Sequence, residues 1–148
     1  MNTIFVSAAF ILITGTVFSQ ECIQKYIGFY KIQMEETIAE IRRTDSERAN
    51  EEVPPEFMEQ MREVKMEIKA DALEMTMMGQ TNEIKVIPRV SKKKGGSCDL
   101  LLGVPPEQLP EGVEIPFLTI YADDYGKLMI KSSGGGNDMD MFVWTKVE

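Results

Sequence analysis

Short apolar runs and turn residues alternate along the second half of the chain, from Ala72 to Val147. The runs are rich in β-branched, aromatic and Met residues, and in the first of them Leu73, Met75 and Met77 alternate with polar side chains. A period of two places successive side chains on opposite faces of a strand. Regular strand-turn-strand spacing therefore predicts an antiparallel meander that curls into a barrel or half-barrel.

The segment before the meander has a different pattern. Residues 28–32 alternate and predict one opening strand. Helical spacing follows in two stretches, and the second opens with Pro54-Pro55, which a first helical turn tolerates. The apolar stripes of these two helices are Met34, Ile38 and Ile41, and then Phe57, Met61, Val64 and Ile68. The predicted fold class is α+β: an opening strand, two helices, then the meander.

The first 19 residues form a separate segment. Met1 to Ser19 has no charged side chain and is mostly apolar, but it is too short for a comfortable membrane span. We expect a signal peptide over residues 1–19, cleaved after Ser19, and one domain over residues 20–148. The processed protein would be secreted or periplasmic, without stable membrane insertion. An uncleaved anchor is the alternative, because the segment has no Lys or Arg.

Composition excludes several classes of function. The net charge of −8 disfavours nucleic acid as a partner, and the one cationic run, residues 92–94, falls in a predicted turn. The chain of 148 residues has no His, which removes imidazole bases, His-dependent triads and His-containing zinc sites. No catalytic or metal-ligating constellation stands out, so we expect neither an enzyme nor a metal or cofactor.

The two cysteines, Cys22 and Cys98, lie far apart in the sequence. An exported chain meets an oxidising compartment, where an even pair predicts one disulfide. Two unpaired thiols are the alternative interpretation.

The order of elements carries a resemblance. A strand opening with Gly28-Phe29-Tyr30, a helical excursion and a meander ending near Lys146 together resemble the small lipocalin-like proteins of the calycin group. That family opens with Gly-x-Trp and packs a basic residue from the end of the barrel over the Trp. Here Tyr30 stands in the place of the Trp, and Lys146 matches the basic residue. The resemblance implies a lipocalin-like barrel and the binding of a small apolar ligand.

The 11 Met residues bear on the same hypothesis, because Met lines pockets for apolar ligands and also fills irregular cores. The leading prediction is an exported, non-enzymatic protein with a small apolar ligand inside the barrel; plain core filling by Met is the alternative. The predicted walls of the pocket are Tyr30, Leu73, Met75, Met77, Ile84, Val86, Leu128 and Ile130.

A second hypothesis is a protein-interaction module with a filled barrel. It would present an acidic helix stripe, or the loop from Pro105 to Gly112, to another exported protein. The stripe consists of Glu52, Glu56, Glu59, Glu63 and Glu67.

Overall fold

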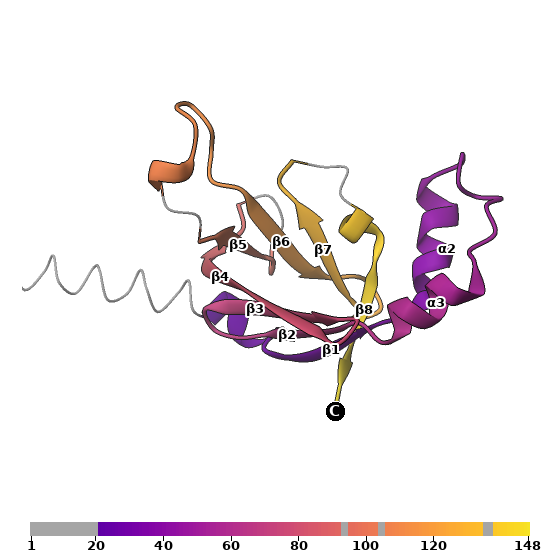
Figure 1. Cartoon of the computed structure of the whole chain (residues 1–148). Helices are drawn as coiled ribbons and strands as arrows, with labels where there is room; N and C mark the ends of the chain where they lie inside the picture. The colour runs from indigo at the N-terminus through magenta and orange to yellow at the C-terminus, as the bar shows by residue number, and fades with distance from the viewer. Residues whose placement is uncertain (1–20, 93–94, 104–105, 135–137) are drawn as a thin grey trace, which may run out of the picture.

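The computed structural model describes residues 21–92, 95–103, 106–134 and 138–148. Within these residues the strands close into an antiparallel barrel in the order β1 to β8 (Figure 1). The strands are β1 (Gly28–Ile32), β2 (Lys65–Ile68), β3 (Ala72–Met77), β4 (Gln80–Val90), β5 (Cys98–Leu102), β6 (Phe117–Ala122), β7 (Leu128–Ser132) and β8 (Val143–Val147). The helices are α2 (Met34–Thr44) and α3 (Pro55–Arg62), with the 3-10 helices η1 (Pro106–Gln108) and η2 (Asp138–Met141).

The barrel closes at β1, which pairs with both β2 and β8. Tyr30 lies opposite Met66 on one side and opposite Lys146 on the other. The opening strand, the helical excursion and the meander are confirmed, and the fold class is α+β. The predicted signal peptide, together with Lys93, Lys94 and Pro105, lies outside the described residues.

The predicted extent of the second helix was wrong. The helix α3 ends at Arg62, and the meander begins with β2 at Lys65 rather than near residue 70. Val64, Met66 and Ile68 are buried, and the residues between them are more exposed. Residues four apart lie on one face of a helix and also on one face of a strand, so the apolar stripe continued into β2 without a visible break.

The final strand is short, because η2 occupies Asp138–Met141 and β8 begins at Val143. This strand is covered on both faces where it begins. Trp144 faces the interior, opposite Leu128 and Ile32, and the outward-facing Val143 is buried as well.

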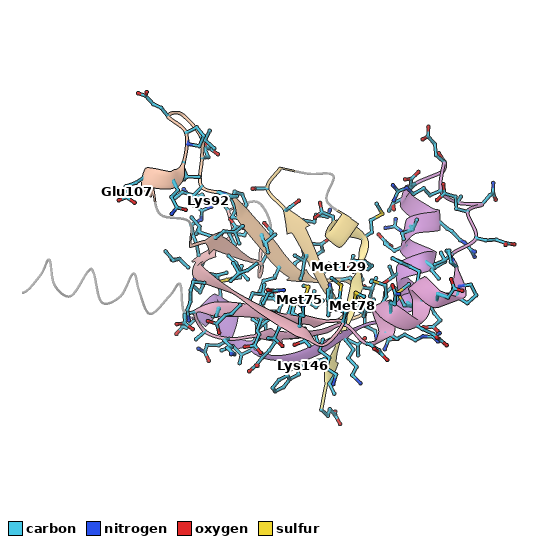
Figure 2. The ribbon with its side chains drawn as sticks, viewed as in Figure 1. Met75, Met78, Lys92, Glu107, Met129 and Lys146 are labelled. Carbon is cyan, nitrogen blue, oxygen red and sulfur yellow. A yellow bond between two sulfur atoms is a disulfide. The ribbon has the colours of Figure 1, made fainter. Side chains whose placement is uncertain are left out.

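Side chains fill the centre of the barrel. In an antiparallel sheet, directly opposite residues lie on the same face, and the register places one continuous set of apolar residues inside. Its fully buried members include Trp144, Met66, Ile68, Leu100, Ile120 and Ile130. Of the Met residues labelled in Figure 2, Met75 is half-buried, Met129 is buried on the outward face of β7, and Met78 is exposed in the β3–β4 turn.

The predicted disulfide between Cys22 and Cys98 is confirmed, with their Cα atoms 5.5 Å apart. It ties the helical turn at residues 21–24 to the start of β5. No helix among the described residues is long and apolar enough to cross a bilayer.

Candidate ligand-binding site

The structure separates the eight predicted pocket residues into different environments. Tyr30, Leu73, Val86, Leu128 and Ile130 are buried in the core, and Met75 is half-buried. Met77 and Ile84 are 44% and 47% exposed, on the part of the β3–β4 hairpin that extends beyond β5. Of these predicted residues, Tyr30 and Leu128 line a smaller pocket at the end of the barrel.

A larger apolar cleft lies outside the barrel, on the side where α2 and α3 project (Figure 1). Its volume is about 360 Å³. It is formed by α2, the segment that leads into α3, the start of α3 and the junction between η2 and β8. Its apolar walls are Met34, Ile38, Ile41, Val53, Pro54, Phe57, Met141 and Phe142.

Hydrogen bonds fix the first turn of α2 against the beginning of β8. The Gln33 backbone N–H donates to the Val143 carbonyl over 2.8 Å. The Val143 backbone N–H in turn donates to Thr37 Oγ1 over 3.0 Å, and Thr37 is fully buried. Because these bonds set the position of α2, they also set the position of the cleft wall carried by Met34 and Ile38.

An ion pair joins the two helices at the edge of the cleft. The Arg62 guanidinium of α3 donates to Glu35 Oε1 of α2 over 2.8 Å. A backbone hydrogen bond at Glu35 itself, and then the bond from Arg62, lower the pKa of the Glu35 carboxyl. Both side chains are more than half exposed, so the pair orients the helices more than it stabilises them.

The rim of the cleft is charged with both signs. Arg42 and Arg48 lie on it together with Glu51 and Glu52. The floor consists of aromatic and aliphatic side chains, with Phe142 packed edge-on against Trp144 at a ring-centroid distance of 6.3 Å. This arrangement accommodates an apolar body and leaves any polar end of a ligand at the solvent.

No protein-family model, curated protein or solved structure matches the chain. The closed eight-stranded barrel of the described residues is compatible with a lipocalin-like architecture. Lys146 pairs with Tyr30 in the sheet, but its side chain lies over Gly28, where an added Cβ would stand 2.6 Å from Lys146 Cε, so its packing over the Tyr30 ring stays a prediction. The cleft and its chemistry therefore have to be interpreted from this chain alone.

The predicted acidic stripe is divided between elements. Glu56 and Glu59 are exposed on α3, whereas Glu63 follows the helix and Glu67 lies on β2. The five glutamates therefore do not form one helix face, and the interaction-module hypothesis stays a prediction. Its other candidate surface, the loop from Pro105 to Gly112, begins outside the described residues.

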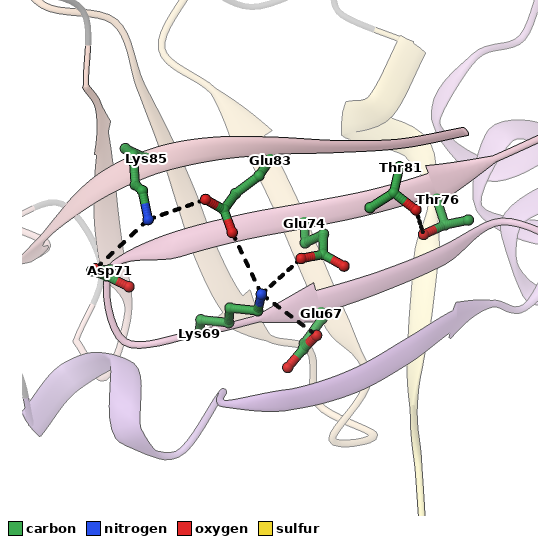
Figure 3. Close-up of polar contacts among 8 residues, drawn as sticks. All are labelled: Glu67, Lys69, Asp71, Glu74, Thr76, Thr81, Glu83 and Lys85. Carbon is green, nitrogen blue, oxygen red and sulfur yellow. Dashed lines mark hydrogen bonds and ion pairs between the residues drawn. The ribbon is translucent and has the colours of Figure 1, made fainter. Parts of the chain in front are cut away.

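Acidic residues on the outer face of β2 to β4 are paired with lysines (Figure 3). Lys69 Nζ lies 2.7 Å from Glu74, 3.5 Å from Glu83 and 3.9 Å from Glu67, and Lys85 Nζ lies 3.1 Å from Glu83. The hydrogen bond from Lys85 is the largest cause that lowers the pKa of Glu83, and the bond to Glu74 is the largest that raises the pKa of Lys69. Because these charges satisfy one another in solvent, the cluster is a surface ion-pair network of small energetic weight.

Sequence reasoning missed most of the cleft. Val53 and Pro54 lie in an irregular segment, and Met141 and Phe142 lie where η2 ends and before β8 begins. One signal was available in the sequence. Phe57, at the start of α3, belongs to an apolar helix stripe for which no packing surface was predicted. An amphipathic helix with no predicted surface to cover is a reason to search beside it for a cleft.

Proposed function

We propose that the protein is a non-enzymatic binding protein that holds a small apolar ligand in the cleft between α2, α3 and η2. The observation that carries this proposal is the apolar lining of a cleft of about 360 Å³. Ligand sites of small molecules are typically concave, mostly apolar and a few hundred Å³ in volume. The sequence-based hypothesis of an apolar ligand is kept, and its site moves from the barrel interior to the helix side.

The structure of the barrel wall supports this location. β7 and β8 pair through two residue pairs, Leu128 with Trp144 and Met129 with Val143. Beyond them η2 occupies the gap between the strands, and α2 packs over it. An interrupted wall leaves apolar side chains facing outward, and α2 and α3 cover these side chains without filling the space between them.

Export is part of the proposal. A disulfide persists in oxidising compartments such as the periplasm or the extracellular space, and the Cys22–Cys98 bond is consistent with that setting. A protein that binds a sparingly soluble apolar molecule outside the cytoplasm would keep it in solution or carry it. The chemical identity of the ligand is limited by volume and polarity to a compact hydrocarbon-rich molecule.

The test is saturable binding of N-phenyl-1-naphthylamine, a neutral apolar fluorophore, to the purified protein. Phe57→Ala removes an aromatic wall of the cleft from a side chain that is 42% exposed, so the barrel is left intact. We expect this variant to weaken binding about five- to thirty-fold, which corresponds to roughly 1–2 kcal/mol of lost apolar contact.

Phe29→Ala is the matched control. Phe29 is 58% exposed on the outer face of β1 and does not line the cleft, so the affinity of this variant should stay within about twofold of the original. Absence of saturable binding, or equal weakening by the two substitutions, would exclude the cleft as the ligand site.

A further inference from the structure

One open end of the barrel forms a second, smaller pocket of about 230 Å³. The sheet register places its residues on the inner face: Tyr30 lies opposite Lys146, and Ala122 lies opposite Leu128. The segment that precedes β1 adds Lys25 and Tyr26. The pocket is therefore the open end of the barrel interior, next to the side chains that fill the centre of the barrel.

The charges at this mouth are all of one sign. Among the residues that the structure describes, the charged ones that line it are Lys25 and Lys146, without a carboxylate. This contrasts with the chain as a whole, in which 24 acidic residues outnumber 16 basic ones. Elsewhere on the described surface, lysines such as Lys69 and Lys85 have acidic partners within 4.0 Å.

Lys146 in particular has no counter-charge. Its Nζ makes no hydrogen bond or ion pair with any residue that the structure describes. Its side chain lies across Gly28, a residue with φ of 146°, and an added Cβ at Gly28 would stand 2.6 Å from Lys146 Cε. The glycine leaves space for the Lys146 side chain, which lines the mouth and is labelled in Figure 2.

Lys25, the other lysine of the mouth, is held by contacts of its own. Its Nζ donates to the Gly96 carbonyl and lies 4.9 Å from the centre of the Tyr26 ring. The Cys22–Cys98 disulfide anchors the turn that carries both residues. A lysine with one bond to a carbonyl retains two N–H donors for a ligand.

The two tyrosines, Tyr26 and Tyr30, line the pocket but offer no hydrogen-bond donor to a ligand. The Tyr30 hydroxyl donates to the Tyr26 carbonyl over 2.6 Å, and the Tyr26 hydroxyl donates to the Gly96 carbonyl over 2.8 Å. Each phenolic proton is already engaged, so an anion would be recognised by the ammonium groups alone. The rings of both tyrosines and the Leu128 side chain offer an apolar surface beneath them.

We infer that the barrel mouth binds a small organic carboxylate with an apolar body. The carboxylate lies between Lys25 and Lys146, and the body packs on Tyr26, Tyr30 and Leu128. The volume of about 230 Å³ is enough for a ring-sized acid. This site is separate from the helix cleft, because no residue lines both.

Binding of benzoate to the purified protein, followed by calorimetry at low salt, tests the inference, with neutral benzamide as the second ligand. We expect saturable benzoate binding that weakens as salt is added. Lys146→Met, which keeps the length of the side chain, should weaken it about tenfold or more, and Lys146→Arg should retain it. Trp fluorescence confirms that each variant is folded.

Lys31→Met is the matched control. Lys31 lies on β1 beside Tyr30 but is exposed on the outer face and does not line the mouth, so its loss should change benzoate affinity by less than about twofold. Benzamide binding as tight as that of benzoate, equal weakening by the two Lys→Met substitutions, or absence of benzoate binding would each overturn the inference. Phe57→Ala should leave benzoate binding unchanged, so failure at the cleft and failure at the mouth are distinguishable.

Discussion

Trp144, the one tryptophan of the chain, is fully buried inside the barrel, and its Nε1–H has no hydrogen-bond partner among the described residues. Trp144→Ala should lower the free energy of unfolding by about 3–5 kcal/mol, because it removes the largest buried side chain and leaves a cavity. Trp144→Phe should have a smaller effect, since it removes an unpaired polar group together with part of the ring. Urea unfolding followed by circular dichroism measures both values. A loss below about 1 kcal/mol for Trp144→Ala would contradict the packing described for the barrel centre.

Tyr30 makes stability depend on alkaline pH. Burial, and then the neighbouring Tyr26, raise the pKa of the Tyr30 hydroxyl above its ordinary value of 10.0. The folded state therefore holds this proton more tightly than the unfolded state does. Its contribution to stability is complete below about pH 10 and is lost as pH rises through the folded-state pKa.

Tyr30→Phe isolates that contribution. The variant loses the bond to the Tyr26 carbonyl and starts from a lower stability, but its stability should fall less steeply above pH 10 than that of the original protein. The measurement is the urea midpoint of each protein between pH 8 and pH 11. Parallel curves would show that Tyr30 does not titrate differently in the two states.

At the scale of elements, the Thr37 side chain contributes a buried hydrogen bond that attaches α2 to the barrel. Thr37→Val removes the acceptor for the Val143 backbone N–H and leaves that donor buried without its partner. The expected loss is about 1–3 kcal/mol in the free energy of unfolding, whereas Thr37→Ser keeps the hydroxyl and should lose less.

The control for this prediction is Thr44→Val at the other end of α2. The Thr44 hydroxyl donates to the Glu40 carbonyl over 2.8 Å, but Thr44 is exposed and water can replace the bond. Its loss should stay within about 0.5 kcal/mol in the same urea titration. If the two Thr→Val variants lost the same stability, the Thr37 bond would not be what holds α2 against β8.

The helices and strands differ in how well they could be predicted from the sequence. The strands after Ala72 were predictable because one of their faces meets solvent, so polar residues mark the period of two. β2 was not, because Val64 and Ile68 satisfy helical and strand spacing equally. The cleft was less predictable still, since Val53 and Pro54 come from an irregular segment and Met141 from a short 3-10 helix, in which no periodicity relates one residue to the next. At the barrel mouth, the inward-facing positions of Tyr30 and Leu128 could be predicted from the alternation of apolar and polar residues. The position of Lys25 could not, because it depends on the disulfide.

At the scale of the whole molecule, both candidate sites lie where the barrel is interrupted. A barrel of this strand number is just wide enough for its side chains to fill, as Trp144 and Met66 do here. Space for a ligand then remains where the pairing of the strands ends or where the inward-facing apolar side chains end. The short β7–β8 pairing creates the helix-side cleft, and the end of the inward-facing apolar set at Lys146 creates the mouth.

Breaking the disulfide should lower the stability of the protein and disturb the barrel mouth, but it should not disturb the helix cleft. Cys22 and Cys98 are separated by 76 positions in the sequence, and restricting so large a loop in the unfolded chain is worth about 4 kcal/mol in the chain-entropy model. Reduction, or Cys22→Ala, should therefore lower Tm by roughly 10–20 °C. It also frees the turn that carries Lys25 and Tyr26, whereas the walls of the helix cleft contain no residue of that turn.

Below the lowered Tm, the reduced protein should thus lose affinity for benzoate and keep its affinity for N-phenyl-1-naphthylamine. Calorimetry and fluorescence titration of the same reduced sample measure the two affinities. Equal loss of both ligands would mean that reduction loosens the whole barrel, and retention of both would mean that the bonds from Lys25 and Tyr26 to Gly96 hold the turn without the disulfide. Selective loss of benzoate is expected because the disulfide is the covalent link between that turn and β5, whereas the cleft is held by the bonds between α2 and β8.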